Sequence, residues 1–438
     1  MTQQLSTPGP AGETPGGPPP ARPGRIRSLL GQVLADITPL RSSPDFRRIW
    51  AGQAVSSIGQ QMTALAVSVQ VYALTRSSFA TGVVGLCSLI PLVGVGLYGG
   101  VIADRFDRRW IGLLGASGLA LLSAVLTLQA ALGLRQVWLL YAVVAVQAVF
   151  FALNAPARAA MIPRLVPGEQ LPAANALGSV SMNLGLTVGP MLGGVLIGTV
   201  GYQAAYLVDT LAFGASLYAM WRLPAMRPLA GDARERTTVM AGLRFLRGRP
   251  NLRTSFVADI VAMVFGMPRA IFPAIAVAFY HGGSGVVGLL TAAPAVGALL
   301  GALFSGWVGR VRRHGLAVIL AVLAWGLTIA GFGALRELWV GLVLLAAAGC
   351  ADTVSMIFRN TILQEAVPDE MRGRLQGVFT VVVAGGPRLG DFEAGTVAQL
   401  TSPGFSAVSG GLACVAGIVV LALMRPGFVR YDARRPTP

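Results

Sequence analysis

The chain has 438 residues, of which 54% are hydrophobic and only 12% are charged, against about 25% charged residues in soluble proteins. A soluble core cannot bury this much apolar sequence without a comparable polar surface, so the composition excludes a soluble globular protein. The net charge of +16 would suit a nucleic-acid partner, but the placement of the basic residues, described below, excludes that class.

The amino-terminal stretch is rich in proline and glycine and lacks the apolar core of a signal peptide. We interpret residues 1–45 as a disordered and then juxtamembrane tail. No cleavable targeting segment is expected, because the first apolar helix can itself serve as the insertion signal.

Twelve segments are apolar enough to cross a bilayer, which takes about 20 residues per helix. They are 47–73, 79–103, 110–132, 137–160, 172–200, 203–223, 254–280, 285–309, 315–334, 338–360, 375–400 and 406–424. The sequence therefore predicts an all-α membrane protein with a six-helix half at 46–224, a central loop at 225–253, a second six-helix half at 254–425 and a tail at 426–438. In the central loop, Val239, Leu243 and Leu246 recur at helical spacing, which indicates either a short amphipathic helix on the membrane surface or a solvated linker.

The two halves are copies of one unit. GVVGL occurs at 82–86 and again at 285–289, and Arg158 reappears 201 positions later as Arg359. Gly189 and Gly194 map by the same shift onto Gly390 and Gly395. An internal repeat of this size in a hydrophobic chain is typical of secondary transporters, in which two halves rock about a central site.

All 34 basic residues are arginine, and 29 of them lie in the two tails, in loops after even-numbered spans or at the adjoining helix ends. Arg76, Arg135 and Arg336 lie in loops on the other side, and Arg269 and Arg388 lie inside spans. Cytoplasmic loops carry the excess of basic residues, so both termini are expected in the cytoplasm. Abundant arginine, alanine and glycine without lysine suggest a bacterial source, and we expect a multi-pass protein of the bacterial cytoplasmic membrane.

After the second span the chain reads Gly100-Val-Ile-Ala-Asp104-Arg105-Phe-Asp-Arg108-Arg109. This closely resembles the G-x-L-A-D-R-x-G-R-R signature of the major facilitator superfamily, with Asp107 where the family has its second glycine. The resemblance implies a gating motif made of Gly100, Asp104, Arg105, Arg108 and Arg109. A carboxylate at a helix end can pair with arginines and face a neighbouring helix amino terminus, although the arginines alone are also explained by topology.

The fifth span carries Gly185, Gly189, Pro190, Gly193 and Gly194. This pattern resembles the signature of proton-coupled exporters in the same superfamily, with Ala176 at the position of a further family glycine. Glycines four residues apart let a neighbouring backbone approach closely, and Pro190 bends the helix, so ordinary helix packing is the alternative explanation. Segments such as 242–246 and 370–374 resemble the branch that contains enterobactin exporters and related multidrug exporters.

Several charged residues fall inside predicted spans, where each costs about 2.5–3.5 kcal/mol at a helix centre unless it faces water or a partner. Candidates for substrate binding or proton coupling are Asp259, Arg269, Asp352, Arg388, Asp391 and Glu393, and Asp209 is the weakest further member. Asp352 and Arg359 share one helix face. Arg388 and Asp391 share a face of another helix, one turn apart, so Arg388 and Asp391 are expected to neutralise each other. Gly266, Pro268 and Pro273 predict a broken helix around Arg269.

The first half offers uncharged polar stripes instead. Cavity-lining candidates are Gln53, Ser57, Gln60, Gln147, Asn154 and Arg158. Hydrogen bonding between helices is the alternative role for each of them. Many superfamily members carry an acid where Gln60 stands, so the resemblance does not extend to that route of proton coupling.

The resemblance to proton-coupled exporters, added to these features, implies an exporter of a siderophore or a drug-like amphiphile that exchanges its substrate for protons by alternating access. The alternatives are a facilitator or importer without proton coupling and a transport-inactive membrane sensor or scaffold. No nucleophile–base set or metal-ligand cluster is recognisable, so we expect no enzyme activity, no metal and no cofactor beyond the proton gradient. The expected partners are the lipid bilayer and a small-molecule substrate, and we expect a monomer.

Overall fold

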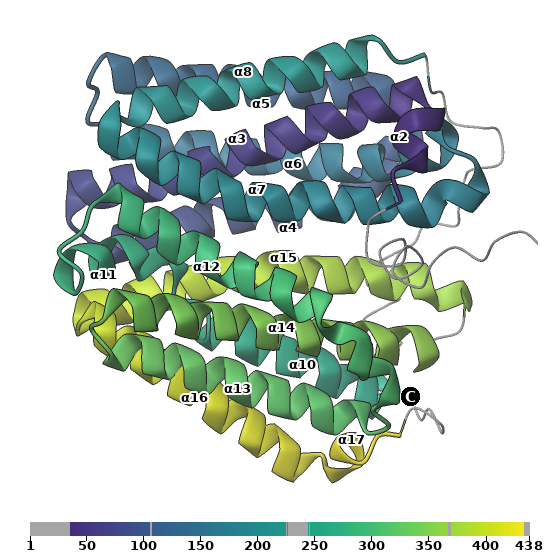
Figure 1. Cartoon of the computed structure of the whole chain (residues 1–438), viewed down its shortest axis with the longest axis vertical. Helices are drawn as coiled ribbons and strands as arrows, with labels where there is room; N and C mark the ends of the chain where they lie inside the picture. The colour runs from purple at the N-terminus through teal and green to yellow at the C-terminus, as the bar shows by residue number, and fades with distance from the viewer. Residues whose placement is uncertain are drawn as a thin grey trace, which may run out of the picture.

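The computed structural model describes residues 36–105, 107–224, 226, 244, 246–366 and 369–432 (Figure 1). Their regular structure is helical throughout. Two helical bundles lie one above the other in Figure 1, the first coloured purple to teal and the second green to yellow. The predicted all-α membrane architecture with two six-helix halves is confirmed.

The first half contains short α2 (Thr38–Ser42) and six long helices with one intervening 3-10 turn. These elements are α3 (Pro44–Thr75), α4 (Ser78–Arg105), α5 (Arg108–Ala131), α6 (Val137–Leu165), η1 (Gly168–Gln170), α7 (Leu171–Thr199) and α8 (Tyr202–Trp221).

The second half, after the central stretch, again has six spans, of which the first is divided into α10, η2 and α11. Its elements are α10 (Pro250–Phe265), η2 (Arg269–Ile271), α11 (Phe272–Ala278), α12 (Ser284–Leu303), η3 (Ser305–Arg310), α13 (His314–Ala334), α14 (Leu338–Ala366), α15 (Asp369–Leu400), α16 (Pro403–Met424) and α17 (Pro426–Val429). α10 therefore begins inside the predicted 225–253 loop. Val239 and Leu243, the start of the predicted amphipathic helix, lie outside the described residues.

Nine of the predicted spans correspond, in the described residues, to helical segments that are long and apolar enough to cross a membrane. The other three coincide with α3, α8 and α15, which have 32, 20 and 32 residues. α3 carries the glutamines of the polar stripe, and α15 carries Arg388, Asp391 and Glu393. Polar residues in these helices lower their hydropathy without shortening them.

The predicted break in the seventh span is confirmed. α10 ends at Phe265, Gly266 caps it, and a short 3-10 turn at Arg269–Ile271 leads into α11. Pro268 has no N–H to continue the helical ladder, and Pro273 occupies the first turn of the next helix, where a missing N–H costs nothing.

Helix packing follows the sequence repeat. In the first half α3 packs on α7 and α8, α4 on α6, and α5 on α6 and α8. In the second half α10 packs on α15 and α16, α12 on α14, and α13 on α14 and α16. The halves meet where α4 packs on α15 and α7 on α12, as two repeats related by a pseudo-two-fold axis require.

The contacts between halves involve the repeated glycines. A Cβ on Gly194 would lie 3.2 Å from the Cα of Gly285, and a Cβ on Gly395 would lie 3.0 Å from the Cα of Gly82. Only glycine allows two helix backbones to approach this closely. GVVGL therefore recurs because each copy packs against the equivalent helix of the other half.

These contacts lie near the end of the molecule that carries the 76–77, 200–201 and 279–283 loops, at the left of Figure 1. α2 and α17 lie at the other end, which we call the termini face. Hydrogen bonds join the halves from Ser77 Oγ to Gln399 Oε1 (2.8 Å) and from Ser284 Oγ to the Gly194 carbonyl (2.8 Å). Farther along α4, a Cβ on Gly94 or Gly96 would have no described neighbour within 4 Å. The halves are thus joined at the face opposite the termini, which we call the opposite face.

Candidate functional site

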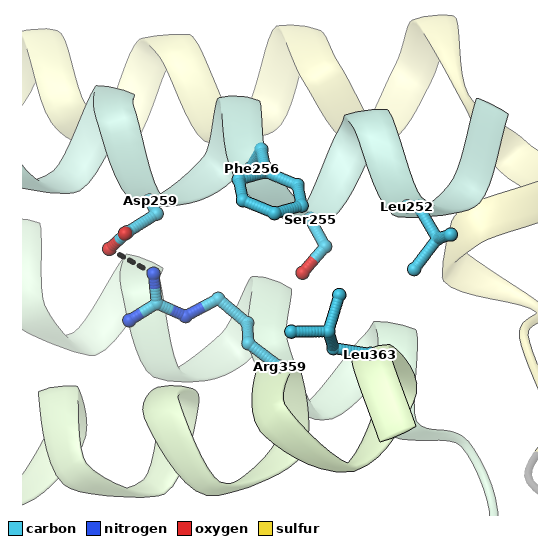
Figure 2. A pocket seen from close by; sticks show the side chains of 6 residues that line it. All are labelled: Leu252, Ser255, Phe256, Asp259, Arg359 and Leu363. Carbon is cyan, nitrogen blue, oxygen red and sulfur yellow. Dashed lines mark ion pairs between the residues drawn. The ribbon is translucent and has the colours of Figure 1, made fainter. Parts of the chain in front are cut away.

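A buried ion pair joins two helices of the second half. The guanidinium of Arg359 on α14 contacts the carboxylate of Asp259 on α10, as Figure 2 shows. Their side chains are 4% and 2% exposed. A buried charge is tolerated only with a partner, because its desolvation costs several kcal/mol.

Asp352 shares the same arginine. Its Oδ1 lies 3.5 Å from Arg359 Nη2, and its side chain is 33% exposed. Arg359 Nε also donates to the Ser355 carbonyl at 3.4 Å. One guanidinium thus faces two carboxylates, one sealed in the protein and one partly open.

The sequence placed Asp352 and Arg359 on one helix face, but it did not identify Arg359 as a site residue. It named the repeat equivalent Arg158 instead. The signal was available, since the shift of 201 residues links the two arginines and Asp259 had been recognised as a charge inside a span.

A cavity of about 10 Å³ adjoins this ion pair, lined by Leu252, Ser255, Phe256, Asp259, Arg359 and Leu363 (Figure 2). Such a volume holds about one water molecule. It is too small for an organic substrate, so this cavity is part of the ion-pair packing.

The broken helix presents Arg269 and a backbone donor. Arg269 is exposed, and it forms no ion pair with another described residue. The next residue, Ala270, donates its backbone N–H to Asp391 Oδ1 of α15 at 3.1 Å. Asp391 is therefore held beside the turn that carries Arg269.

The expected internal pair of Arg388 and Asp391 is not formed. Arg388 Nε donates to Ser88 Oγ on α4 at 2.9 Å, and its Nη1 donates to the Ala384 carbonyl. Arg388 therefore links the two halves, while Asp391 binds the turn after α10. Spacing along one helix placed both groups on one face but could not reveal that each has a neighbour from another helix.

Glu393 also lies on α15 and is half-buried. It has no hydrogen bond or ion pair to another described residue. Its neighbour Phe392 packs against Phe79 of α4 with tilted rings, whose centroids are 5.8 Å apart.

The polar stripe of the first half divides into two groups. The side chains of Gln53, Gln60 and Gln147 are half-buried and have no hydrogen bond to a described residue, which suits a cavity wall. Arg158 Nη2 donates to Ser216 Oγ at 2.9 Å, which joins α6 to α8.

Two further members of the stripe serve helix packing. Asn154 is buried against α5, where a Cβ on Gly115 would meet its side chain at 2.9 Å. Ser57 packs on α7, where a Cβ on Gly185 would lie 2.9 Å from the Ser57 Cβ.

The glycine motif of α7 faces two neighbours. Gly185, Gly189 and Gly193 pack on successive turns of α3, against Ser57, Gln61 and Met62. Gly194 and the Pro190 carbonyl face α12 instead, across the junction of the halves. The motif thus lets one helix pack closely on both its own half and the other.

The gating motif lies at the termini face. The surroundings of Gly100 and the side chains of Asp104 and Arg105 lie outside the described part of the structure. Arg108 Nη1 donates to the Ala160 carbonyl at 3.2 Å, and Arg109 Nη2 donates to the Trp221 carbonyl at 2.6 Å. The two described arginines therefore bind carbonyls near the carboxyl ends of α6 and α8 within their own half. The helix dipole is negative at that end and stabilises a positive charge there.

Asp107, which replaces a family glycine, caps α5. Its Oδ1 accepts from the Arg109 N–H at 2.9 Å and from the Met226 N–H at 3.1 Å. The substitution thus adds a tether between the start of α5 and the segment after α8.

Asp209 is fully buried in α8 and forms no ion pair with a described residue. Its Oδ2 accepts from Thr63 Oγ1 of α3 at 2.8 Å and from Ser123 Oγ of α5 at 2.6 Å. Its place between three helices of the first half separates it from the charges of α10, α14 and α15.

Comparison with known proteins identifies the fold and the family. Residues 34–433 match the family model described as transmembrane secretion effector. The chain is 29% identical to the enterobactin exporter of Citrobacter koseri, over 92% of this chain and 97% of that protein, and 30% identical to the enterobactin exporter of Shigella boydii, over 89% and 94%.

Solved transporters share the fold at low identity. A POT family transporter in complex with 5-aminolevulinic acid aligns with a TM-score of 0.71 and 11% identity, covering 88% of this chain and 97% of that one. An inward-facing bacterial homologue of the human lysosomal transporter Spinster aligns with a TM-score of 0.69 and 15% identity, covering 91% and 98%. The chain therefore belongs to the transmembrane secretion effector family of the major facilitator superfamily, whose members are transporters and not enzymes.

Proposed function

We propose that this transporter exports an anionic organic molecule in exchange for protons. The observation that carries the proposal is Arg269, an exposed guanidinium within a membrane-spanning segment that forms no ion pair with a described residue. A guanidinium keeps its charge at any ordinary pH and needs water or an anion beside it. An anionic substrate entering between the halves would supply that partner.

The orientation follows from charge. Arginines concentrate at the termini face, which supports a cytoplasmic location for it. Because the halves are joined at the opposite face, the arrangement corresponds to a state closed to the outside. Substrate would then enter from the cytoplasm and leave after the repeated glycine contacts separate.

Proton coupling is assigned to the carboxylates of the second half, Asp259, Asp352, Asp391 and Glu393. Asp352 is the strongest of them, because it is partly exposed and shares Arg359 with the sealed Asp259. Exchange requires that proton binding and substrate binding oppose each other, because the linkage between two ligands is reciprocal. Protonation of these carboxylates should therefore weaken substrate binding, and substrate binding should release the proton.

For the substrate, we propose a catecholate siderophore. The enterobactin exporters of Citrobacter koseri and Shigella boydii are similar to this chain over most of its length, and catecholate oxygens are acidic acceptors suited to a guanidinium. A cationic drug has no such partner at Arg269.

The test is accumulation of enterobactin in inverted membrane vesicles, with and without a proton uncoupler. We expect uncoupler-sensitive accumulation that falls at least tenfold in Arg269→Ala and recovers partly in Arg269→Lys. Arg336→Ala, which removes an arginine that stacks on Phe279 in a loop of the opposite face, is the matched control and should transport normally.

Two outcomes would overturn parts of the proposal. Enterobactin accumulation that is the same with and without the uncoupler would indicate a facilitator. Normal transport by Arg269→Ala would remove this arginine from the substrate site. To locate the proton carrier, substrate-driven proton movement is compared in Asp259→Asn, Asp352→Asn, Asp391→Asn and Glu393→Gln; if all four match the wild type, coupling lies elsewhere.

A further inference from the structure

A second cavity lies at the opposite face, away from the charged residues of α10, α14 and α15. Its volume is about 270 Å³, close to the lower limit of about 300 Å³ for small-molecule pockets. Both halves line it, with Tyr72, Arg76 and Tyr202 from the first and Pro273, Val277 and Ser284 from the second. It therefore spans the junction that holds the two halves together.

Arg76 supplies the charge of this cavity. Its side chain is exposed and forms no ion pair with a described residue. Its backbone is held in place, because Arg76 has the left-handed conformation (φ 52°) and closes α3 by donating its N–H to the Tyr72 carbonyl at 2.8 Å. The guanidinium thus starts from the carboxyl end of α3, and both Arg76 and Tyr202 line the cavity.

The polar groups of the cavity are mainly donors. The hydroxyls of Tyr72 and Tyr202 make no hydrogen bond to a described residue, and a neutral phenol can donate one. The Ser284 hydroxyl is already used, since it donates to the Gly194 carbonyl. No carboxylate is among the lining residues, so a cation has no counter-charge here.

The rest of the lining is apolar. Pro273 and Val277 of α11 face Val69 of α3 across the cavity. Apolar walls around a few convergent donors are the usual composition of a small-ligand site. The lining thus favours an apolar body with an anionic group.

We propose that this cavity is a second ligand site, which binds an aromatic carboxylate. The carboxylate pairs with Arg76 and accepts from the two tyrosine hydroxyls, while the ring packs between α3 and α11. A guanidinium–carboxylate pair can be bidentate, which orients the ligand.

Such a ligand would act on the conformational equilibrium. It contacts both halves, so it binds the joined arrangement better than one in which α7 and α12 have separated. A ligand shifts an equilibrium only through such differential affinity. The expected effect is inhibition of outward opening by an aromatic anion supplied at this face.

The test uses the purified full-length protein in nanodiscs of uncharged lipid and titrates it with benzoate by calorimetry. Benzylammonium and inorganic phosphate are the reversed-charge and non-aromatic probes. We expect saturable benzoate binding, at least tenfold weaker in Arg76→Ala and severalfold weaker in Tyr202→Phe. Benzoate should also raise the unfolding temperature of the wild type, because a ligand of the folded state stabilises it.

Arg135→Ala, which removes another loop arginine on the same face, is the matched control and should bind benzoate normally. Arg269→Ala should also bind it normally, which separates this site from the proposed transport site. Equal binding by Arg76→Ala and the wild type, no benzoate binding, or equal binding of benzylammonium overturns the proposal. Phosphate binding as tight as that of benzoate would indicate a lipid-headgroup site and overturn the aromatic assignment.

Discussion

Arg359 of α14 forms a buried ion pair with Asp259 of α10, two residues separated by a hundred positions in the chain. The contact ties the amino-terminal segment of a broken helix to an unbroken neighbour. It also leaves Asp352 as the accessible carboxylate beside the same guanidinium. The pair thus joins α10 to α14, and it determines which carboxylate beside Arg359 is accessible.

The first prediction concerns this pair. Asp259→Ala should lower the free energy of unfolding by about 3–5 kcal/mol, because it leaves a guanidinium buried beside one loosely placed carboxylate. An Asp259→Leu/Arg359→Met double variant, which removes both charges, should recover much of that loss. Thermal unfolding of the purified variants measures both effects.

Arg158, the repeat equivalent of Arg359, is the control for that prediction. It has one described hydrogen bond, to Ser216, and no ion pair in the described residues. Arg158→Met should therefore cost only about 1 kcal/mol. A loss in Arg158→Met as large as that in Asp259→Ala would contradict a special role for the ion pair.

The second prediction concerns Asp209. Its carboxylate accepts from two buried hydroxyls, so Asp209→Ala should cost about 1–3 kcal/mol for the donors left without an acceptor. Asp209→Asn keeps an acceptor oxygen and should cost less. Asp45→Ala, which removes a half-buried carboxylate that pairs only with Arg48 one turn along α3 in the described residues, is the control, and an Asp209→Ala variant as stable as this control would refute the prediction.

The third prediction concerns the junction of the halves. Ser77 and Gln399 are joined by a side-chain hydrogen bond of 2.8 Å across it. In a Ser77→Cys/Gln399→Cys variant, oxidation should link α4 to α15 and stop transport, and reduction should restore it. The measurement is gel mobility of a chain cleaved between the halves, together with vesicle transport.

Each single cysteine variant is the control and should be insensitive to oxidant. A cross-linked protein that still transports would show that these ends do not separate during the cycle. This result would also contradict the proposed exit route.

The fourth prediction concerns Asp107, the residue that departs from the family motif. Asp107→Ala should lower stability by about 1 kcal/mol, the usual cost of losing a helix amino-terminal cap. Asp107→Asn should be close to the wild type, since asparagine also caps. Chemical unfolding of the three proteins measures this difference. An Asp107→Ala protein as stable as the wild type would show that the cap does not contribute to stability.

Much of the architecture was determined by the sequence itself. Long apolar runs must become helices in a bilayer, because every backbone polar group there needs an internal partner. The same runs placed Arg269, Asp352 and Asp391 inside spans, and Gly266 with two prolines located the break in the seventh span. The repeat identified two equivalent halves, because each copy folds under the same constraints.

Only the tertiary structure decided which side chains meet. Helical periodicity assigns a residue to a face, but the partner on that face depends on how neighbouring helices cross and rotate. Arg388 and Asp391 share a face, yet one binds Ser88 of α4 and the other the N–H of Ala270. Asp259 found Arg359, and Ser57 packed on Gly185, for the same reason: contacts between helices are set by three-dimensional packing, which one-dimensional spacing does not contain.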